Sequence, residues 1–127
     1  MKIPRLNDMP YEDLLEKVIA DGLAEVAIAY ADEGKEMKLR GAIAGFELMR
    51  GKSRDEIKGL ADATRDQAIE AFNKQADDYW FWRLRAAQTE WVLNVINAAD
   101  YAHGRPTDFA PTSRGYEKAA SILGPAA

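Results

Sequence analysis

Four aromatic residues stand side by side in this sequence, at Tyr79, Trp80, Phe81 and Trp82, within a segment that favours a helix. Successive residues of an α-helix are turned by ~100°, so four neighbours point to every side of the cylinder. One buried stripe cannot cover them all. We therefore expect the segment to run through the middle of the protein, or to be covered by a second copy or another protein.

The composition limits the class of protein. The 127 residues are 47% hydrophobic and 30% charged, which predicts one folded domain and excludes general disorder. A net charge of -4 makes nucleic acid a disfavoured partner, because proteins that bind it usually carry a basic excess. The absence of cysteine excludes disulfides, thiolate catalysis and cysteine-bound metals.

No segment has the composition of a membrane span or of a secretion signal. The most apolar run, residues 23–31, is much shorter than the ~20 residues that a span needs, and it contains Glu25. Residues 1–7 lack the apolar centre of a signal peptide. We therefore expect a cytoplasmic protein with no membrane partner.

Apolar periodicity predicts two helices in the first half of the chain, over about residues 10–30 and 35–50. Gly34 is the expected break between them. Gly41 and Gly45 lie one turn apart on the second helix, so a neighbouring helix or an aromatic ring is expected to approach its backbone closely there.

Two capping signals follow. Residues 53–56 and 64–67 both fit the capping box, in which two side chains satisfy free N–H groups at a helix start. They predict a short helix over residues 54–62 and a long one over about 65–102. The long helix would reach ~55 Å, against a diameter of roughly 36 Å for a compact domain of this size. We expect it to kink, near residues 73–75, or to project and be covered in an oligomer.

The predicted long helix carries more apolar surface than one face can hold. One side is lined by Ile69, Phe72, Ala76, Trp80, Ala87, Trp91, Val95 and Ala98. Further apolar residues widen this arc, so we expect the helix to be the central and most buried element of an all-α bundle of four to five helices. The chain is expected as one domain, residues 1–127, with an N-terminal tail over 1–8. A turn-rich connection over 104–111 precedes a short C-terminal helix capped by Thr112 or Ser113.

Arg83 and Arg85 follow the aromatic run and point to nearly opposite sides of a helix. Neither has an acidic residue three or four positions away, so pairing along the helix does not explain them. Because Trp and Arg are enriched at binding hot spots, we predict an interface that uses Tyr79, Trp82, Arg83, Arg85 and Leu93. The alternative is a core helix whose arginines extend to the surface. Our leading hypothesis is a non-enzymatic interaction or regulatory protein that assembles with itself or with a protein partner.

A second hypothesis is a DNA-binding regulator. Residues 53–74 have the outline of a helix-turn-helix whose second helix exposes Arg65, Gln67, Asn73 and Lys74 to bases and phosphates. The turn lacks the glycine that such motifs favour, and acidic residues would also face the phosphates. A plain helical hairpin explains the same pattern.

A third hypothesis is a metal-dependent helical hydrolase or a small-ligand binder. Glu33 and Glu36 have the i, i+3 spacing of metal-holding carboxylates, but no second pair matches them, so we predict no metal site and no cofactor. Residues 51–53, Gly-Lys-Ser, lack the earlier glycine and the strand of a phosphate-binding loop. His103, the only histidine, is expected to have a structural role near the end of a helix.

Overall fold

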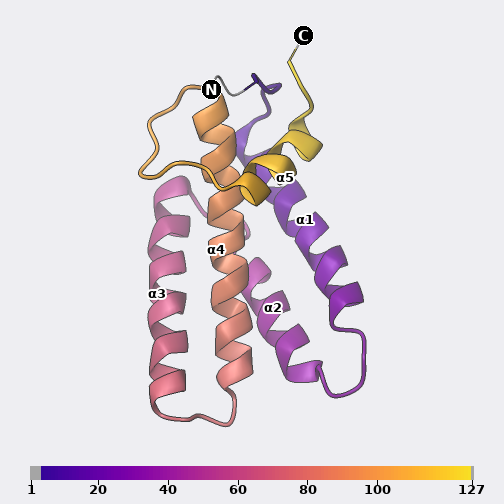
Figure 1. The fold of residues 1–127 in the computed structure, drawn as a ribbon, viewed down its shortest axis with the longest axis vertical. Helices are drawn as coiled ribbons and strands as arrows, with labels where there is room; N and C mark the ends of the chain where they lie inside the picture. Colours follow the sequence, from indigo (N-terminus) through magenta and orange to yellow (C-terminus); the bar gives the residue numbers. More distant parts are fainter. Residues whose placement is uncertain (1–3, 127) are drawn as a thin grey trace.

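The computed structural model describes residues 4–126 as five helices, with α4 at the centre. The helices are α1 (Tyr11–Ala29), α2 (Glu36–Met49), α3 (Arg54–Asn73), α4 (Tyr79–Ala102) and α5 (Ser113–Leu123). The first four run alternately down and up, and α5 crosses the upper end, where both termini lie (Figure 1). Helix α4 packs against each of the other four. The predicted all-α class is confirmed: the described residues form no strand beyond one isolated bridge between Leu6 and Pro125.

Helices α2 and α4 run parallel and lie very close together because of two glycines. A Cβ atom added at Gly41 would lie 2.3 Å from the carbonyl oxygen of Phe81, and one at Gly45 would lie 2.6 Å from that of Arg85. A larger residue fits at neither place unless a backbone moves. The close approach predicted at these glycines is therefore confirmed, and the neighbour is the aromatic helix itself.

The long helix predicted over residues 65–102 is wrong, because the chain forms two helices there. Helix α3 ends at Asn73, and the chain reverses over residues 74–78, where Gln75 has a positive φ of 53°. The break, over residues 74–78, overlaps the kink that was predicted near residues 73–75. The 24 residues of α4 give a length of ~36 Å, which fits a compact domain of this size.

The turn predicted near residue 63 is absent, so the helix-turn-helix over residues 53–74 is also wrong. The capping box at residues 53–56 does start α3, but Thr64 lies buried in the middle of the same helix. Its hydroxyl is 2.9 Å from the Leu60 carbonyl oxygen and 2.6 Å from the Thr89 hydroxyl of α4. Because this hydroxyl is satisfied within the bundle, it does not act as a helix cap.

The chain termini close the upper end. Leu6 is buried, and the backbone N–H of Asn7 donates to the Gly124 carbonyl at 2.9 Å. Residues 4–8, predicted as a tail, therefore lie against the C-terminal segment, while residues 1–3 of that tail lie outside the described part. The predicted turn-rich connection and the Thr112 cap of α5 are both confirmed. None of the described helices is long and apolar enough to cross a membrane.

Candidate interaction surface on the α3–α4 hairpin

Helix α3 lies on the outside of the bundle and packs mainly against α4 (Figure 1). Its buried face consists of Ile57, Ala61, Thr64, Ala68 and Ala71. Apart from Ile57 these side chains are small, so the two helices lie close together, and Ile69 and Phe72 of α3 fall outside the contact.

The apolar side chains at the lower end form one continuous surface. Ile69, Phe72 and Trp80 are 51%, 66% and 48% exposed. Tyr79 joins them, because its ring centroid lies 5.7 Å from that of Phe72 and 5.2 Å from that of Trp80. The aromatic start of α4, predicted to be among the most buried segments, is therefore one of the more open ones. The break after α3 explains this. Because α3 and α4 are separate helices, their apolar side chains do not form the single stripe that one continuous helix would have had.

Two grooves follow the two sides of α3. The first has a volume of about 310 Å³, and we name it the Phe72 groove; its lining residues are Arg65, Ala68, Ile69, Phe72, Tyr79, Arg83, Ala86 and Glu90. The second has a volume of about 290 Å³, and we name it the Trp82 groove; its lining residues are Gln67, Glu70, Ala71, Lys74, Ala76 and Trp82.

The five residues predicted as one interface occupy three places. Tyr79 and Arg83 lie together in the Phe72 groove. Trp82 lies in the other groove, with the guanidinium carbon of Arg85 5.5 Å from its ring centroid. Leu93 lies higher on α4 and is half-buried against the core. The predicted set therefore does not form one surface. It omits Ile69 and Phe72, which are more exposed than any of its apolar members.

The four residues considered for DNA contact do not share one face either. Arg65 lies in the Phe72 groove, whereas Gln67 and Lys74 lie in the Trp82 groove. Gln67 already accepts a hydrogen bond of 2.6 Å from an arginine of α4, and Lys74 is paired with a glutamate one turn earlier. Asn73 is exposed at the last turn of α3.

The charges in the Phe72 groove differ in how they are paired. Arg65 lies 3.6 Å from Asp62 and 3.8 Å from Asp66 on its own helix. Arg83 and Glu90 are exposed, and neither forms an ion pair or a side-chain hydrogen bond within residues 4–126. They are seven positions apart on α4, so they lie two turns apart on the same face.

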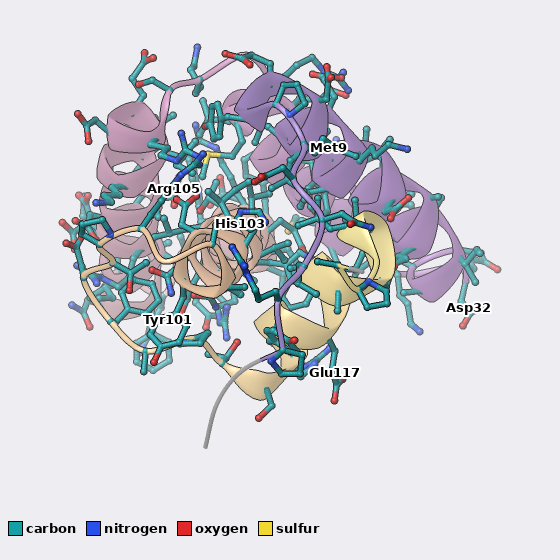
Figure 2. All side chains as sticks on the ribbon, turned by 90° about the horizontal axis from the view of Figure 1, so that it is seen from above. Met9, Asp32, Tyr101, His103, Arg105 and Glu117 are labelled. Atoms are coloured by element: carbon teal, nitrogen blue, oxygen red, sulfur yellow. The ribbon has the colours of Figure 1, made fainter. Side chains whose placement is uncertain are left out.

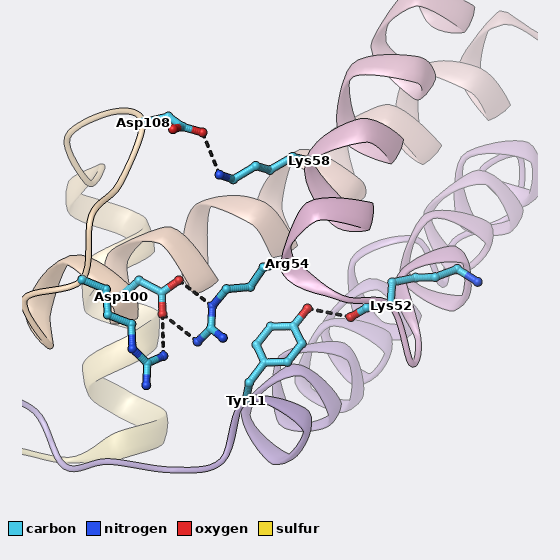
Figure 3. A network of polar contacts seen from close by, with 7 residues as sticks. Tyr11, Lys52, Arg54, Lys58, Asp100 and Asp108 are labelled. Carbon is cyan, nitrogen blue, oxygen red and sulfur yellow. Dashed lines mark hydrogen bonds and ion pairs between the residues drawn. The ribbon is translucent and has the colours of Figure 1, made fainter.

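The upper end of the bundle contains a polar cluster whose charged groups are paired with one another. Asp100 is buried and accepts two hydrogen bonds of 2.9 Å from Arg54 and one of 3.1 Å from Arg105 (Figure 3). The Arg54 guanidinium also lies 4.5 Å from the centre of the Tyr11 ring, and the Tyr11 hydroxyl donates to the Lys52 carbonyl at 2.6 Å.

This cluster joins α1, α3, α4 and the connection before α5, which indicates a structural role. The hydrogen bonds to Asp100 raise the pKa of Arg54, and burial raises the pKa of Tyr11 to about 12. The cluster could not be predicted from the sequence, because Arg54 and Asp100 are 46 positions apart and no local pattern relates them. Every buried side-chain polar atom in residues 4–126 has a hydrogen-bond partner, so none is left waiting for a ligand.

The remaining candidate residues lie at separate places on the molecule. His103 lies between the end of α4 and the N-terminal segment, with Nε2 3.0 Å from the Asn7 carbonyl oxygen (Figure 2). Glu33 and Glu36 are exposed, and hydrogen bonds from backbone N–H groups lower the pKa of Glu36. Residues 4–126 contain no group of three or more side chains able to hold a metal ion.

Another hollow, of about 590 Å³, lies beside Tyr11 at the upper end. Its lining contains acidic and basic side chains from α1, from the turn before α3 and from the first turn of α3, including Glu12, Lys52 and Glu56. This mixture favours no ligand charge.

Comparison with known proteins gives no family for this chain: no family model, curated protein or solved structure matches it. We therefore infer the function from the geometry of the molecule.

Proposed function

We propose that this protein is a non-enzymatic interaction module that binds a protein surface through the Phe72 groove and the adjoining Trp80 ring. The observation that carries the proposal is the exposure of Ile69, Phe72 and Trp80 at one end of the molecule. A contiguous apolar patch on a soluble domain is typical of a contact surface. The cytoplasmic location proposed for it rests on the sequence alone.

The free energy gained by covering these apolar side chains supports association. Fully covering a large apolar side chain is worth about 1.5–3 kcal/mol, so covering the exposed halves of these three would supply about 2–4 kcal/mol. Arg65 and Arg83 line the same groove. An apolar centre with a polar rim is the usual composition of an interface.

The Trp82 groove is the weaker candidate. Trp82 is already half-buried, and the polar side chains around it have partners within the same chain. Binding there would require those contacts to be broken or covered. The surface that we propose therefore keeps Tyr79 and Arg83 from the predicted interface and adds Ile69, Phe72 and Trp80.

A photo-crosslinking residue in place of Phe72 tests this proposal in cells that express the protein. The matched control carries the same residue in place of Ile28, which is 81% exposed on α1. We expect a discrete protein adduct from position 72, identified by mass spectrometry, and none from position 28. If position 72 gave no adduct, or if both positions gave the same products, the proposed surface would be wrong.

A further inference from the structure

We propose that the occupant of the Phe72 groove is a second copy of the same chain, packed antiparallel about a two-fold axis near Ala86. This inference rests on the proposed function and adds the identity and the orientation of the partner. It follows from the order of charges along α4.

Arg83 and Glu90 lie on either side of Ala86 in the groove, and neither is paired within the described chain. A two-fold axis midway between them reverses the direction of α4 in the second copy. Arg83 of each copy then faces Glu90 of the other, giving two identical ion pairs. A parallel arrangement would instead place Arg83 against Arg83 and Glu90 against Glu90, and like charges across an interface are unfavourable. The charge order therefore favours the antiparallel arrangement.

The side chains around the axis fit such a contact. Tyr79, Arg83, Ala86, Glu90 and Leu93 follow one another at alternating steps of four and three residues, the spacing of a helix–helix seam. Ala86 is buried at the floor of the groove, so the two α4 helices would meet through the exposed Arg83 and Glu90 side chains on either side of it. At each end of the contact the Tyr79 ring supplies the apolar area, because Leu93, which lies level with it on the other copy, is half-buried in a different hollow.

The flanking helix adds apolar area on the same side. Ile69 and Phe72 of α3 line the groove beside this seam. Under the same two-fold axis, α3 of one copy also faces α3 of the other. Both exposed side chains thereby lose contact with water. The same axis passes near Arg65, because Thr64 lies level with Thr89 and Phe72 with Tyr79. Each Arg65 lies 3.6 Å from Asp62 and 3.8 Å from Asp66 on its own helix, which offsets the repulsion between the two Arg65 side chains.

The area predicts a weak dimer. The stretch from Tyr79 to Leu93 is ~21 Å long and two adjacent helices are ~20 Å wide, so the contact covers roughly 400 Å² on each copy. This is about half of the ~800 Å² per partner in a stable complex. We therefore expect a weak and reversible dimer.

Charge reversal tests the proposal by sedimentation velocity and light scattering over a dilution series from about 1 µM to about 1 mM, the range in which weak association is detected. Arg83→Glu alone and Glu90→Arg alone each create two like-charge contacts, so each is expected to weaken the dimer by about tenfold or more. The double variant restores both ion pairs and the dimer. An equimolar mixture of the two single variants is also expected to associate, because each copy then meets its complement.

The control variant Phe72→Ser removes apolar contact without changing charge, and circular dichroism checks that every variant is folded. Loss of the dimer in Phe72→Ser with no response to charge reversal would overturn the antiparallel arrangement and leave the proposed surface intact. A wild type that stays monomeric throughout would overturn the second copy as occupant, and crosslinking at position 72 would then test the surface with other proteins. If both Phe72→Ser and the reversals left a dimer unchanged, the inference and the proposed surface would both be wrong.

Discussion

The two halves of α4 differ in what covers them. In the upper half, every residue from Val95 to Asp100 is buried, and the one charged group among them has three hydrogen bonds. In the lower half, no residue from Tyr79 to Arg83 is buried. Yet the lower half has the larger apolar side chains. Aromatic content is therefore no measure of burial in this helix; the number of elements that surround each half decides it.

The lower half is packed against α2 and α3 and is open on its remaining side. There α2 lies against its backbone through two glycines, α3 contributes mainly alanines, and nothing described covers the Phe72 groove. In the upper half, α1, α5 and the N-terminal segment complete the enclosure (Figure 1). The open side is what a partner would cover.

The largest expected effect concerns the tight side of the lower half. Gly41→Ala would place a methyl group 2.3 Å from the Phe81 carbonyl oxygen, so α2 and α4 must separate and unfolding should become easier by about 2–3 kcal/mol. Urea denaturation measures the change. The matched control is Gly59→Ala, where nothing lies within 4 Å; there better helix propensity should stabilise by about 0.5–1 kcal/mol. Equal effects at the two positions would contradict the close α2–α4 contact.

The upper half is expected to depend on its buried charge. Asp100→Asn keeps the shape of the side chain but weakens three charge-assisted hydrogen bonds, so we expect a loss of about 2 kcal/mol. Thermal and urea denaturation both report it. The control is Asp108→Asn, since the Asp108 carboxylate, 2.8 Å from Lys58, is exposed and its loss should matter far less. A cost as small as that of the control would show that the cluster does not hold the upper end together.

The contact between α3 and α4 has one buried polar pair, and its coupling is measurable. Thr64→Val or Thr89→Val leaves the other hydroxyl without its partner 2.6 Å away, so each should cost about 1 kcal/mol. The double variant removes both hydroxyls, and its cost should be smaller than the sum of the two. A double-mutant cycle by urea denaturation gives the coupling directly. Strict additivity would mean that the two hydroxyls do not interact.

The pH dependence of stability at alkaline pH tests the same upper end, and we expect a smaller effect there. The pKa of Tyr11 is raised from 10.0 to about 12 by burial, so the folded state holds this proton more tightly than the unfolded state. The stability that this contributes is present below pH 10 and is lost as the pH rises from 10 to about 12. Tyr11→Phe should remove this part of the pH dependence. Parallel stability curves for the two proteins over that range would contradict the assignment.

The smallest expected effect on stability is at the open side of the lower half. Phe72→Ser changes a side chain that is 66% exposed, so the free energy of unfolding of the monomer should stay within about 0.5 kcal/mol of wild type. Denaturation at low protein concentration measures the monomer alone. A loss comparable to that at Gly41 would show that Phe72 belongs to the core and not to a contact surface.

Local signals in the sequence were sufficient for much of the fold. Gly41 and Gly45 predicted a close approach, and residues 53–56 predicted the start of a helix, because both features act over one or two turns. The helix start predicted at Thr64 was wrong for the same reason. The local pattern is the same whether the hydroxyl caps a helix or donates back to a carbonyl of its own helix. The ambiguity is resolved only by Thr89, 25 positions away.

The candidate site was less predictable. The reversal after Asn73 contains neither Gly nor Pro, so Ile69, Phe72 and Trp80 appeared to continue one stripe. Whether an apolar stripe is covered depends on which elements return to pack on it, and no local pattern records that. The link between Arg54 and Asp100 was hidden likewise by its separation in the chain.

Methyl NMR of isoleucine-labelled protein over a dilution series tests the central claim most directly. Ile69 and Ile28 are both exposed, but only Ile69 lies in the Phe72 groove. We predict that the Ile69 methyl signal shifts as the concentration rises towards about 1 mM, where a weak dimer forms, while the Ile28 signal stays fixed. A fixed Ile69 signal, or equal shifts at both residues, would contradict self-association through this groove.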